Sequence, residues 1–493
     1  MAYFFKSGAS SSVATSDALK ISALTGVFAL GLLLLGSVIF YKERMLMADA
    51  PWVVYNIINT HSLFIQEHRY GAFITQMFPL AGSLLHLPLQ WILVLYSASF
   101  NLFYFISGLA LYRKGQYTFA LLLALYCTVC VSDSYFWTNN EVHQGVCWCM
   151  LLCGYWRYPE AQARGKFPFW LLFTLFAALA IFSHPIIIIL TVYIFGFYLL
   201  AGNESGKRRL IALVVIPAII AVKYYLSKSG WYDEGKISTL ESISFSQVKG
   251  VLHTSTARIF LSHCLGRYWA FSLLTLLSAG TLLYARKFLQ LLWMLSFFTV
   301  YFIAVCTVYP NCDFPFYIES EWMCISIIAA LPFVVHGLSG WRKEAAAVLF
   351  ASFFLSAAII IPLSVKPFQE RIALLEKMMD YFRSRNWRKV IILTDEHNFN
   401  NKLEQKLIMS WGMPAEMLIL SRTDHLQQAG VTAVCLSQKA FHSSYTRTDE
   451  ETFINTFYAE KKGTLNPLYF SIDTTVRYTT IPVDSVIVVL QIR

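Results

Sequence analysis

The sequence has few charged residues for its length. Only 14% of the 493 residues are Asp, Glu, Lys or Arg, whereas a soluble domain carries about 25%. Hydrophobic residues make up 57% of the chain. This composition excludes an ordinary soluble protein and indicates a chain that crosses a lipid bilayer many times. The net charge of +10 does not indicate nucleic acid, because most of the excess Lys and Arg lies in short loops between apolar runs.

Two further patterns are missing. Many transporters contain internal sequence repeats, and this chain shows none. We also expect no cleavable signal, since residues 1–20 are polar and the apolar run that follows is too long for a signal-peptide core. We therefore expect residues 1–20 to form a cytoplasmic tail and residues 21–41 to form the first transmembrane helix.

Apolar runs recur along residues 21–364, and a bilayer core takes about 20 residues of helix. We predict an α-helical polytopic membrane protein with about eleven transmembrane helices. The predicted spans are 21–41, 89–112, 117–135, 140–156, 168–182, 185–201, 209–226, 265–285, 288–308, 321–338 and 344–364.

The orientation follows from the distribution of Lys and Arg. If residues 71–88, which contain Pro79 and Pro88, form an interfacial or re-entrant piece, the loops "YRKGQ", "RYPEAQARGK", "GNESGKRR", "ARK" and "GWRKE" all lie inside. Each of these loops contains at least two Lys or Arg. The outer loops are then 42–88, "FWTNN", 183–184, 227–264 and "PNCDFPFYIESE". We expect residues 52–64 to form an amphipathic helix on the membrane surface.

Two carboxylates stand at the outer ends of spans. Asp49 follows the first span in "ADAPWVVYNII", and Glu141 opens the fourth span in "FWTNNEVHQG". An ionisable residue near the bilayer is costly and is a functional candidate. Such a pair can take a proton from an acceptor hydroxyl or hold a divalent cation. We predict Asp49 and Glu141 as the catalytic residues of one outer cavity; the structural alternative is that they only cap the helices they begin.

Basic residues in the same outer segments are candidates to bind a phosphate group, because His and Arg stabilise developing phosphate charge. The candidates are His143, His184, Arg69, His68, Arg258 and Arg267. His184 precedes Pro185 and has a structural alternative, the satisfaction of backbone groups that the proline leaves unpaired. Asp313, Glu319 and Glu321 are interpreted as a solvated outer loop. No residue is assigned as a metal ligand and no cofactor is assigned with certainty; a divalent cation is left open.

The composition changes after Pro362. Residues 366–493 are ordinary in charge and long enough for a small domain. "FQERIALLEKMMDYFRSR" has helical periodicity, whereas "KVIILTD", "EMLILS", "TAVCLS" and "SVIVVLQ" are predicted strands. With helices expected near 398–411 and 448–461, this indicates a soluble α/β domain with a partly parallel sheet on the outer face. The domain has no glycine-rich phosphate loop.

In layout the chain resembles the GT-C superfamily of membrane glycosyltransferases, which includes protein O-mannosyltransferases and lipid A aminoarabinose transferases. Asp49 falls at the first acidic motif of that superfamily, and Glu141 falls at the second, at the start of the fourth span. "SHP" at 183–185 matches a polar-proline break that many members have. A long later outer loop and a soluble C-terminal domain are also found there.

The resemblance implies a glycosyltransferase that moves a sugar from a polyprenyl-phosphate or polyprenyl-diphosphate donor to the hydroxyl of a glycan, lipid or protein acceptor. Asp49 would be the general base of an inverting reaction, and Glu141 would orient the acceptor or assist a divalent cation. The expected location is a bacterial inner membrane, with the N-terminus cytoplasmic and the C-terminal domain periplasmic. The alternatives are an O-antigen ligase or polymerase-like enzyme, a transporter or flippase, and a non-catalytic assembly protein.

Overall fold

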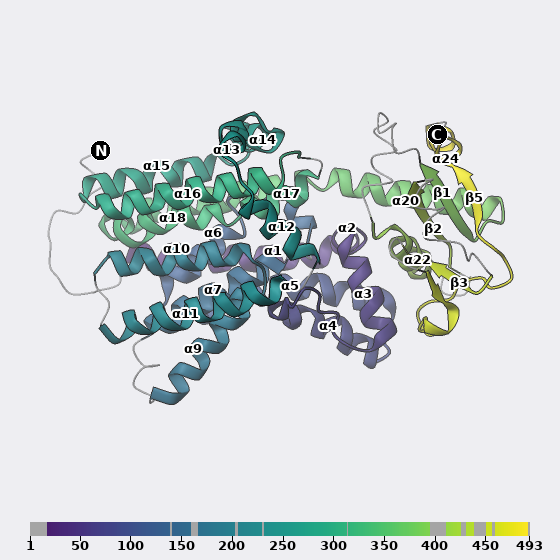
Figure 1. The fold of residues 1–493 in the computed structure, drawn as a ribbon, viewed down its shortest axis with the longest axis horizontal. Helices are drawn as coiled ribbons and strands as arrows, with labels where there is room; N and C mark the ends of the chain where they lie inside the picture. The colour runs from purple at the N-terminus through teal and green to yellow at the C-terminus, as the bar shows by residue number, and fades with distance from the viewer. Residues whose placement is uncertain are drawn as a thin grey trace.

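A long bundle of helices continues at one end into a smaller domain that contains the strands (Figure 1). The structure is a computed structural model. It describes residues 17–138, 141–158, 166–202, 206–228, 231–312, 314–394, 411–424, 430–437, 450–455 and 459–491. Among these residues helix predominates, as the apolar composition predicts.

The bundle contains helices of very different lengths. Their bounds are α1 (Asp17–Ile39), α2 (Tyr41–Met45), α3 (Asp49–Thr60), η2 (Tyr70–Ala72), α4 (Phe73–Leu84), α5 (Leu89–Arg113), α6 (Tyr117–Tyr126), η3 (Asp133–Phe136), α7 (Glu141–Arg157), α9 (Lys166–Ile181), α10 (Ile186–Leu200), α11 (Gly206–Ser227), α12 (Trp231–Glu241), α13 (Phe245–Gly250), η4 (Val251–His253), α14 (Ser255–Cys264), α15 (Trp269–Tyr284), α16 (Phe288–Val308), α17 (Pro315–Trp322), α18 (Ile325–Pro332), η5 (Phe333–Gly337), η6 (Leu338–Gly340) and α19 (Lys343–Leu363).

Five helical segments within the described ranges are long and apolar enough to cross a membrane. They are Asp17–Ile39, Leu89–Arg113, Phe288–Val308, Pro315–Gly340 and Lys343–Ser384. Shorter apolar helices cover Tyr117–Tyr126, Pro168–Ile181, Ile186–Leu200, Ala212–Ser227 and Trp269–Tyr284. The prediction of a multi-span helical protein is therefore confirmed at this level.

Helix α1 is a central element of the bundle, because it packs against α5, α6 and α19. Small residues allow this close packing: a Cβ atom added at Gly26 would lie 2.7 Å from the Cβ of Ala124. Helices that lack a hydrophobic driving force between them associate through such small residues, because backbones can then approach closely. Gly26 thus lets the middle of α1 lie close to α6.

The predicted span 117–135 is helical only as far as Tyr126. The chain then runs through turns to η3, and Glu319 replaces the missing helical hydrogen bonds by accepting from the backbone N–H groups of Ser132 and Ser134. Glu319 and Glu321 are only 4% and 1% exposed. The interpretation of these two glutamates as a solvated loop is therefore wrong; Asp313 lies outside the described residues.

The smaller domain has the bounds α20 (Lys366–Ser384), β1 (Lys389–Thr394), α22 (Met413–Asp424), β2 (Thr432–Ser437), β3 (Thr452–Ile454), β4 (Ala459–Lys461), η7 (Lys462–Thr464), β5 (Thr479–Pro482) and α24 (Val483–Gln491). Its sheet has the order β2-β1-β5 and is parallel, with Ile391 opposite both Val434 and Thr480. Strands β3 and β4 form a separate antiparallel pair.

Three predictions for this domain are wrong. "EMLILS" lies in helix α22 and "SVIVVLQ" lies in helix α24, because short apolar runs fit a buried helix as well as a strand. The helix expected at 448–461 is instead the β3–β4 pair where the structure describes it. The helix expected at 398–411 falls almost entirely outside the described residues. The strands predicted at "KVIILTD" and "TAVCLS" and the helix at "FQERIALLEKMMDYFRSR" are confirmed.

Helix α3 is covered by the smaller domain, so the expectation that residues 52–64 lie exposed on a membrane surface needs correction. Residues Ala50 to Ile58 are all buried. The ring of Tyr55 packs 5.4 Å from the rings of Phe453 and Phe470, and its hydroxyl donates to Glu460 at 3.0 Å. The apolar face of α3, which suggested contact with lipid, is instead covered by the smaller domain.

The loop before α3 is clamped by α22. The backbone N–H of Ala48 donates to Glu416 Oε1 at 2.6 Å, and Glu416 Oε2 accepts from Arg371 of α20 at 2.5 Å. Arg371 and Glu416 are both buried. A Cβ atom at Gly412 would lie 2.1 Å from the carbonyl oxygen of Ala48, so only glycine permits this approach.

The clamp predicts a large effect for Glu416→Gln. The substitution leaves Arg371 buried without its carboxylate, which should lower the free energy of unfolding by about 3 kcal/mol. The matched control is Glu450→Gln, whose partner Arg477 is 73% exposed, so its cost should stay below about 1 kcal/mol. Thermal melts of the purified full-length proteins provide the comparison, and equal small shifts would contradict the clamp.

Candidate functional site

A buried ion-pair network centres on Arg69, which lies in the segment between α3 and η2. Its Nη1 donates to Glu141 Oε2 at 2.8 Å and its Nη2 donates to Asp233 Oδ1 at 2.7 Å. Glu141 is the first residue of α7, and Asp233 lies in the first turn of α12. A planar guanidinium offers donors in a rigid fork, so it can join carboxylates from two separate helices.

Lys223, near the end of α11, completes this network. Its Nζ lies 3.4 Å from Asp233 Oδ2 and donates to the Glu67 carbonyl at 3.1 Å. Burial raises the pKa of Asp233, but Arg69 and Lys223 outweigh it and hold that pKa below its ordinary value. Two carboxylates and two cations therefore balance one another, and they join α7, α11 and α12 to the loop after α3.

Asp49 is held in a different way from the other two carboxylates. It is the first residue of α3, and its Oδ1 accepts a hydrogen bond from Trp411 Nε1 at 2.6 Å. Burial raises the pKa of Asp49 to about 7; the Trp411 hydrogen bond opposes this, the charge of Glu141 adds to it, and Arg69 and Lys236 lower it. The charges of the Arg69 network thus act on Asp49, although its direct partner comes from the smaller domain.

Aromatic rings connect Asp49 to Lys236 of α12. The ring of Trp411 lies edge-on to Trp137 at 5.8 Å, and Trp137 lies edge-on to Tyr317 of α17 at 5.7 Å. Lys236 Nζ donates to the Tyr317 hydroxyl at 3.2 Å. Helices α3, α12 and α17 lie at the end of the bundle next to the smaller domain (Figure 1). The candidate site is therefore at the junction of the two parts.

Several of the predicted residues meet here. Asp49, Glu141 and Arg69 belong to one electrostatic group. His184 is buried, and its Nδ1 accepts from the backbone N–H of Ile186 at 3.3 Å, which matches its structural alternative. Burial lowers the pKa of His184, and the charges of Arg69 and Lys236 lower it further.

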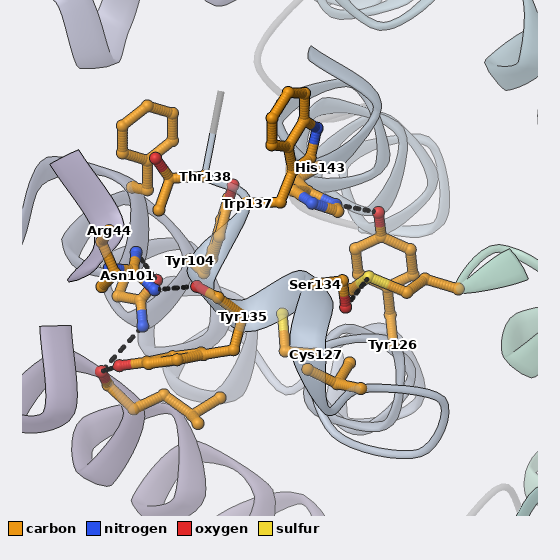
Figure 2. Close-up of a pocket in the computed structure, with 14 residues that line it drawn as sticks. Arg44, Asn101, Tyr104, Tyr126, Cys127, Ser134, Tyr135, Trp137, Thr138 and His143 are labelled. Carbon is orange, nitrogen blue, oxygen red and sulfur yellow. Dashed lines mark hydrogen bonds between the residues drawn. The ribbon is translucent and has the colours of Figure 1, made fainter. Parts of the chain in front are cut away.

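The remaining predicted residues have other partners. His143 lies near the start of α7, and its Nδ1 shares a hydrogen bond of 2.6 Å with the Tyr126 hydroxyl beside a small cavity (Figure 2). His68 Nδ1 lies 3.2 Å from the Tyr70 hydroxyl. Arg258 donates to the carbonyl of His253, and Arg267 pairs with Asp133 at 3.6 Å. The structure does not bring these last two into the Arg69 network.

Sequence reasoning missed four members of the site. Lys223 interrupts an apolar run, and an ionisable residue in such a run is itself a signal. Asp233 and Lys236 stand in "SGWYDEGK", a segment with an acidic and aromatic start. Trp411 carries no local signal, because it reaches Asp49 only through the docking of a distant domain.

No group of three His, Cys, Asp or Glu side chains in the described part of the chain is placed to hold a metal ion. No protein-family model, curated protein or solved structure matches this chain. Its function therefore has to be argued from the site itself.

The raised pKa of Asp49 predicts a pH-dependent stability difference. Between its ordinary value of 3.8 and about 7, the folded protein holds a proton that the unfolded chain has released, so the wild type loses stability as pH rises. Asp49→Asn removes this titration. The melting temperature of the variant relative to the wild type should therefore rise across that range and level off above it. A difference in melting temperature that does not change with pH would contradict the raised pKa of Asp49.

Proposed function

We propose that the chain is a membrane glycosyltransferase that moves a sugar from a polyprenyl-phosphate or polyprenyl-diphosphate donor to an acceptor hydroxyl. Asp49 is its general base. The observation that carries this proposal is the combination of a pKa near 7 with a partly buried position at the junction of the bundle and the smaller domain. A general base works best when its pKa lies near the operating pH.

The reaction follows from this arrangement. Asp49 takes the proton of the acceptor hydroxyl as its oxygen attacks the anomeric carbon of the donor sugar. The bond from that carbon to the phosphate oxygen breaks, the configuration inverts, and the lipid phosphate leaves with the bonding electrons. The protonated Asp49 then returns its proton to solvent.

Charge compensation for the leaving phosphate comes from the cations near Asp49. Lys236 and Arg69 both lower the pKa of Asp49, so their fields reach the site where negative charge develops. Preorganised cations stabilise such charge more effectively than water does. Glu141, fixed by Arg69, is assigned to orient the acceptor.

The proposed topology has about eleven crossings, with the N-terminus in the cytoplasm and the smaller domain outside. Two observations support it. The loops rich in Lys and Arg all fall on one side in this arrangement. Helices α3 and α12, which contain Asp49 and Lys236, lie at the opposite end, beside the smaller domain (Figure 1), and Trp411 contacts Asp49 there. A lipid-linked donor then keeps its chain in the bilayer while its sugar reaches the site.

Loss of product from an Asp49→Asn variant tests the function. Mass spectrometry of glycans and lipids should reveal a glycosylated product that disappears when the gene is deleted. The wild-type chain and Asp380→Asn, which changes a carboxylate that is 71% exposed, should restore it. Asp49→Asn should not, at equal protein level. An unchanged glycan and lipid profile in the deletion strain would remove the proposal.

The hydrogen bond from Trp411 predicts the pH profile of the reaction. Product formation should decline as pH falls through about 7, because Asp49 becomes protonated. Trp411→Phe removes the donor that lowers this pKa, so the acidic limb should move to higher pH. Trp387→Phe, in an aromatic cluster with Tyr381 and Phe382, is the matched control and should leave the limb in place. A shift toward lower pH in Trp411→Phe would rule out this role for Asp49.

A further inference from the structure

Arg44 of α2 is a buried cation whose partners are all neutral. Its side chain donates to Ser97 Oγ at 2.9 Å, to Asn101 Oδ1 at 3.3 Å and to the backbone carbonyl of Tyr135. Its guanidinium also lies 4.3 Å from the centre of the Tyr135 ring. Arg44 is 2% exposed, and no carboxylate in the described ranges pairs with it. Burying a charge without an opposite charge is unfavourable, and a bound anion would remove much of that penalty.

Three further polar groups near Arg44 are buried without a hydrogen-bond partner among the described residues. They are the hydroxyls of Tyr104 and Thr138 and the indole N–H of Trp137. All three side chains are more than nine-tenths buried. An indole nitrogen only donates, and the two hydroxyls can donate as well. Most buried polar groups are paired, so three unpaired ones in one place require an explanation.

Arg44 and these three groups line the same cavity, together with His143 and Ser134 (Figure 2). They come from α2, α5, the segment 133–138 and α7. The cavity volume of about 40 Å³ is room for roughly three water molecules. That space fits a phosphoryl group and is too small for a sugar ring. A buried positive charge beside three unused hydrogen-bond donors favours an oxyanion over a cation as the ligand of this cavity.

An apolar groove adjoins this cavity. It has a volume of about 240 Å³ and runs between α1 and α19, lined by small residues such as Ala29, Gly36 and Ala358. Leu33 and Tyr135 line both spaces, so the cavity and the groove are adjacent. A hydrocarbon chain fits the groove, which makes a lipid a natural source of the anion.

We propose that the Arg44 cavity binds a terminal phosphate group, carried by a lipid whose chain lies along α1 and α19. The proposal does not depend on sugar transfer, because it rests on the charge and the unused donors of the cavity. The cavity lies close to Asp49, since Trp137 lines it and also contacts Trp411. A lipid phosphate held there would lie beside the candidate site.

Binding measurements on the full-length protein in detergent test this. The probes are inorganic phosphate, a polyprenyl monophosphate and the diester phospholipid phosphatidylglycerol, measured by calorimetry or native mass spectrometry. The monophosphate lipid should bind, and Arg44→Gln should weaken its binding at least about tenfold, as expected for a lost charge-assisted hydrogen bond. Lys42→Gln, on the same short helix, is the control and should leave binding unchanged.

Thr138→Val keeps the proposal testable if Arg44→Gln does not fold. Its hydroxyl has no partner among the described residues, so its removal should leave the melting temperature unchanged or raised while it weakens phosphate binding.

Ala358→Trp should fill the groove and weaken binding of the lipid without affecting binding of inorganic phosphate. Equal binding of inorganic phosphate and the lipid would remove the groove from the proposal. A wild-type protein that binds none of the probes, or Arg44→Gln and Thr138→Val variants that bind like the wild type, would show a water-filled cavity and overturn it.

Discussion

The hydrogen bond between the backbone of Ala48 and the carboxylate of Glu416 joins residues that are 368 positions apart in the chain. It fixes the residue next to Asp49 against the smaller domain, and Arg371 fixes Glu416 in turn. A Cβ atom at Gly412 would clash with the Ala48 carbonyl oxygen, so the two backbones meet directly at this contact. The position of Asp49, and of Trp411 against it, depends on this docking.

The charges around the site divide into two kinds. Arg69, Lys223, Glu141 and Asp233 compensate one another and hold the helix ends together. Asp49 is outside this balance: it has an indole partner rather than a cation, and its pKa is raised. Structural ion pairs lower carboxylate pKa values, whereas groups that exchange protons at neutral pH need raised ones. This difference is why we propose Asp49 for proton transfer and the Arg69 network for the framework of the site.

The sequence predicted those parts of the fold that depend on local pattern. The helix 89–112 is α5 with almost the same bounds, because a long apolar run without charge permits little else. Short apolar runs were ambiguous, and "SVIVVLQ" became a helix although β-branched residues favour strands. Glu319 could not be placed from sequence, since the N–H donors that stabilise it belong to Ser132 and Ser134.

The same limit applies to the candidate site. Asp49, Glu141 and Arg69 were found because polar residues beside apolar runs stand out. Trp411 and Arg44 were missed, because their significance lies in what they meet: the first residue of α3 in one case and a cavity without a carboxylate in the other. Such features arise only from tertiary contacts.

The contact between Asp49 and Trp411 is tested most directly by a double-mutant cycle on the free energy of unfolding at pH 8. Asp49→Asn, Trp411→Phe and the double variant should show a coupling energy of about 1–3 kcal/mol, as expected for a hydrogen bond to a charged group. Additive effects would mean that the two side chains do not meet and that the smaller domain does not complete the site.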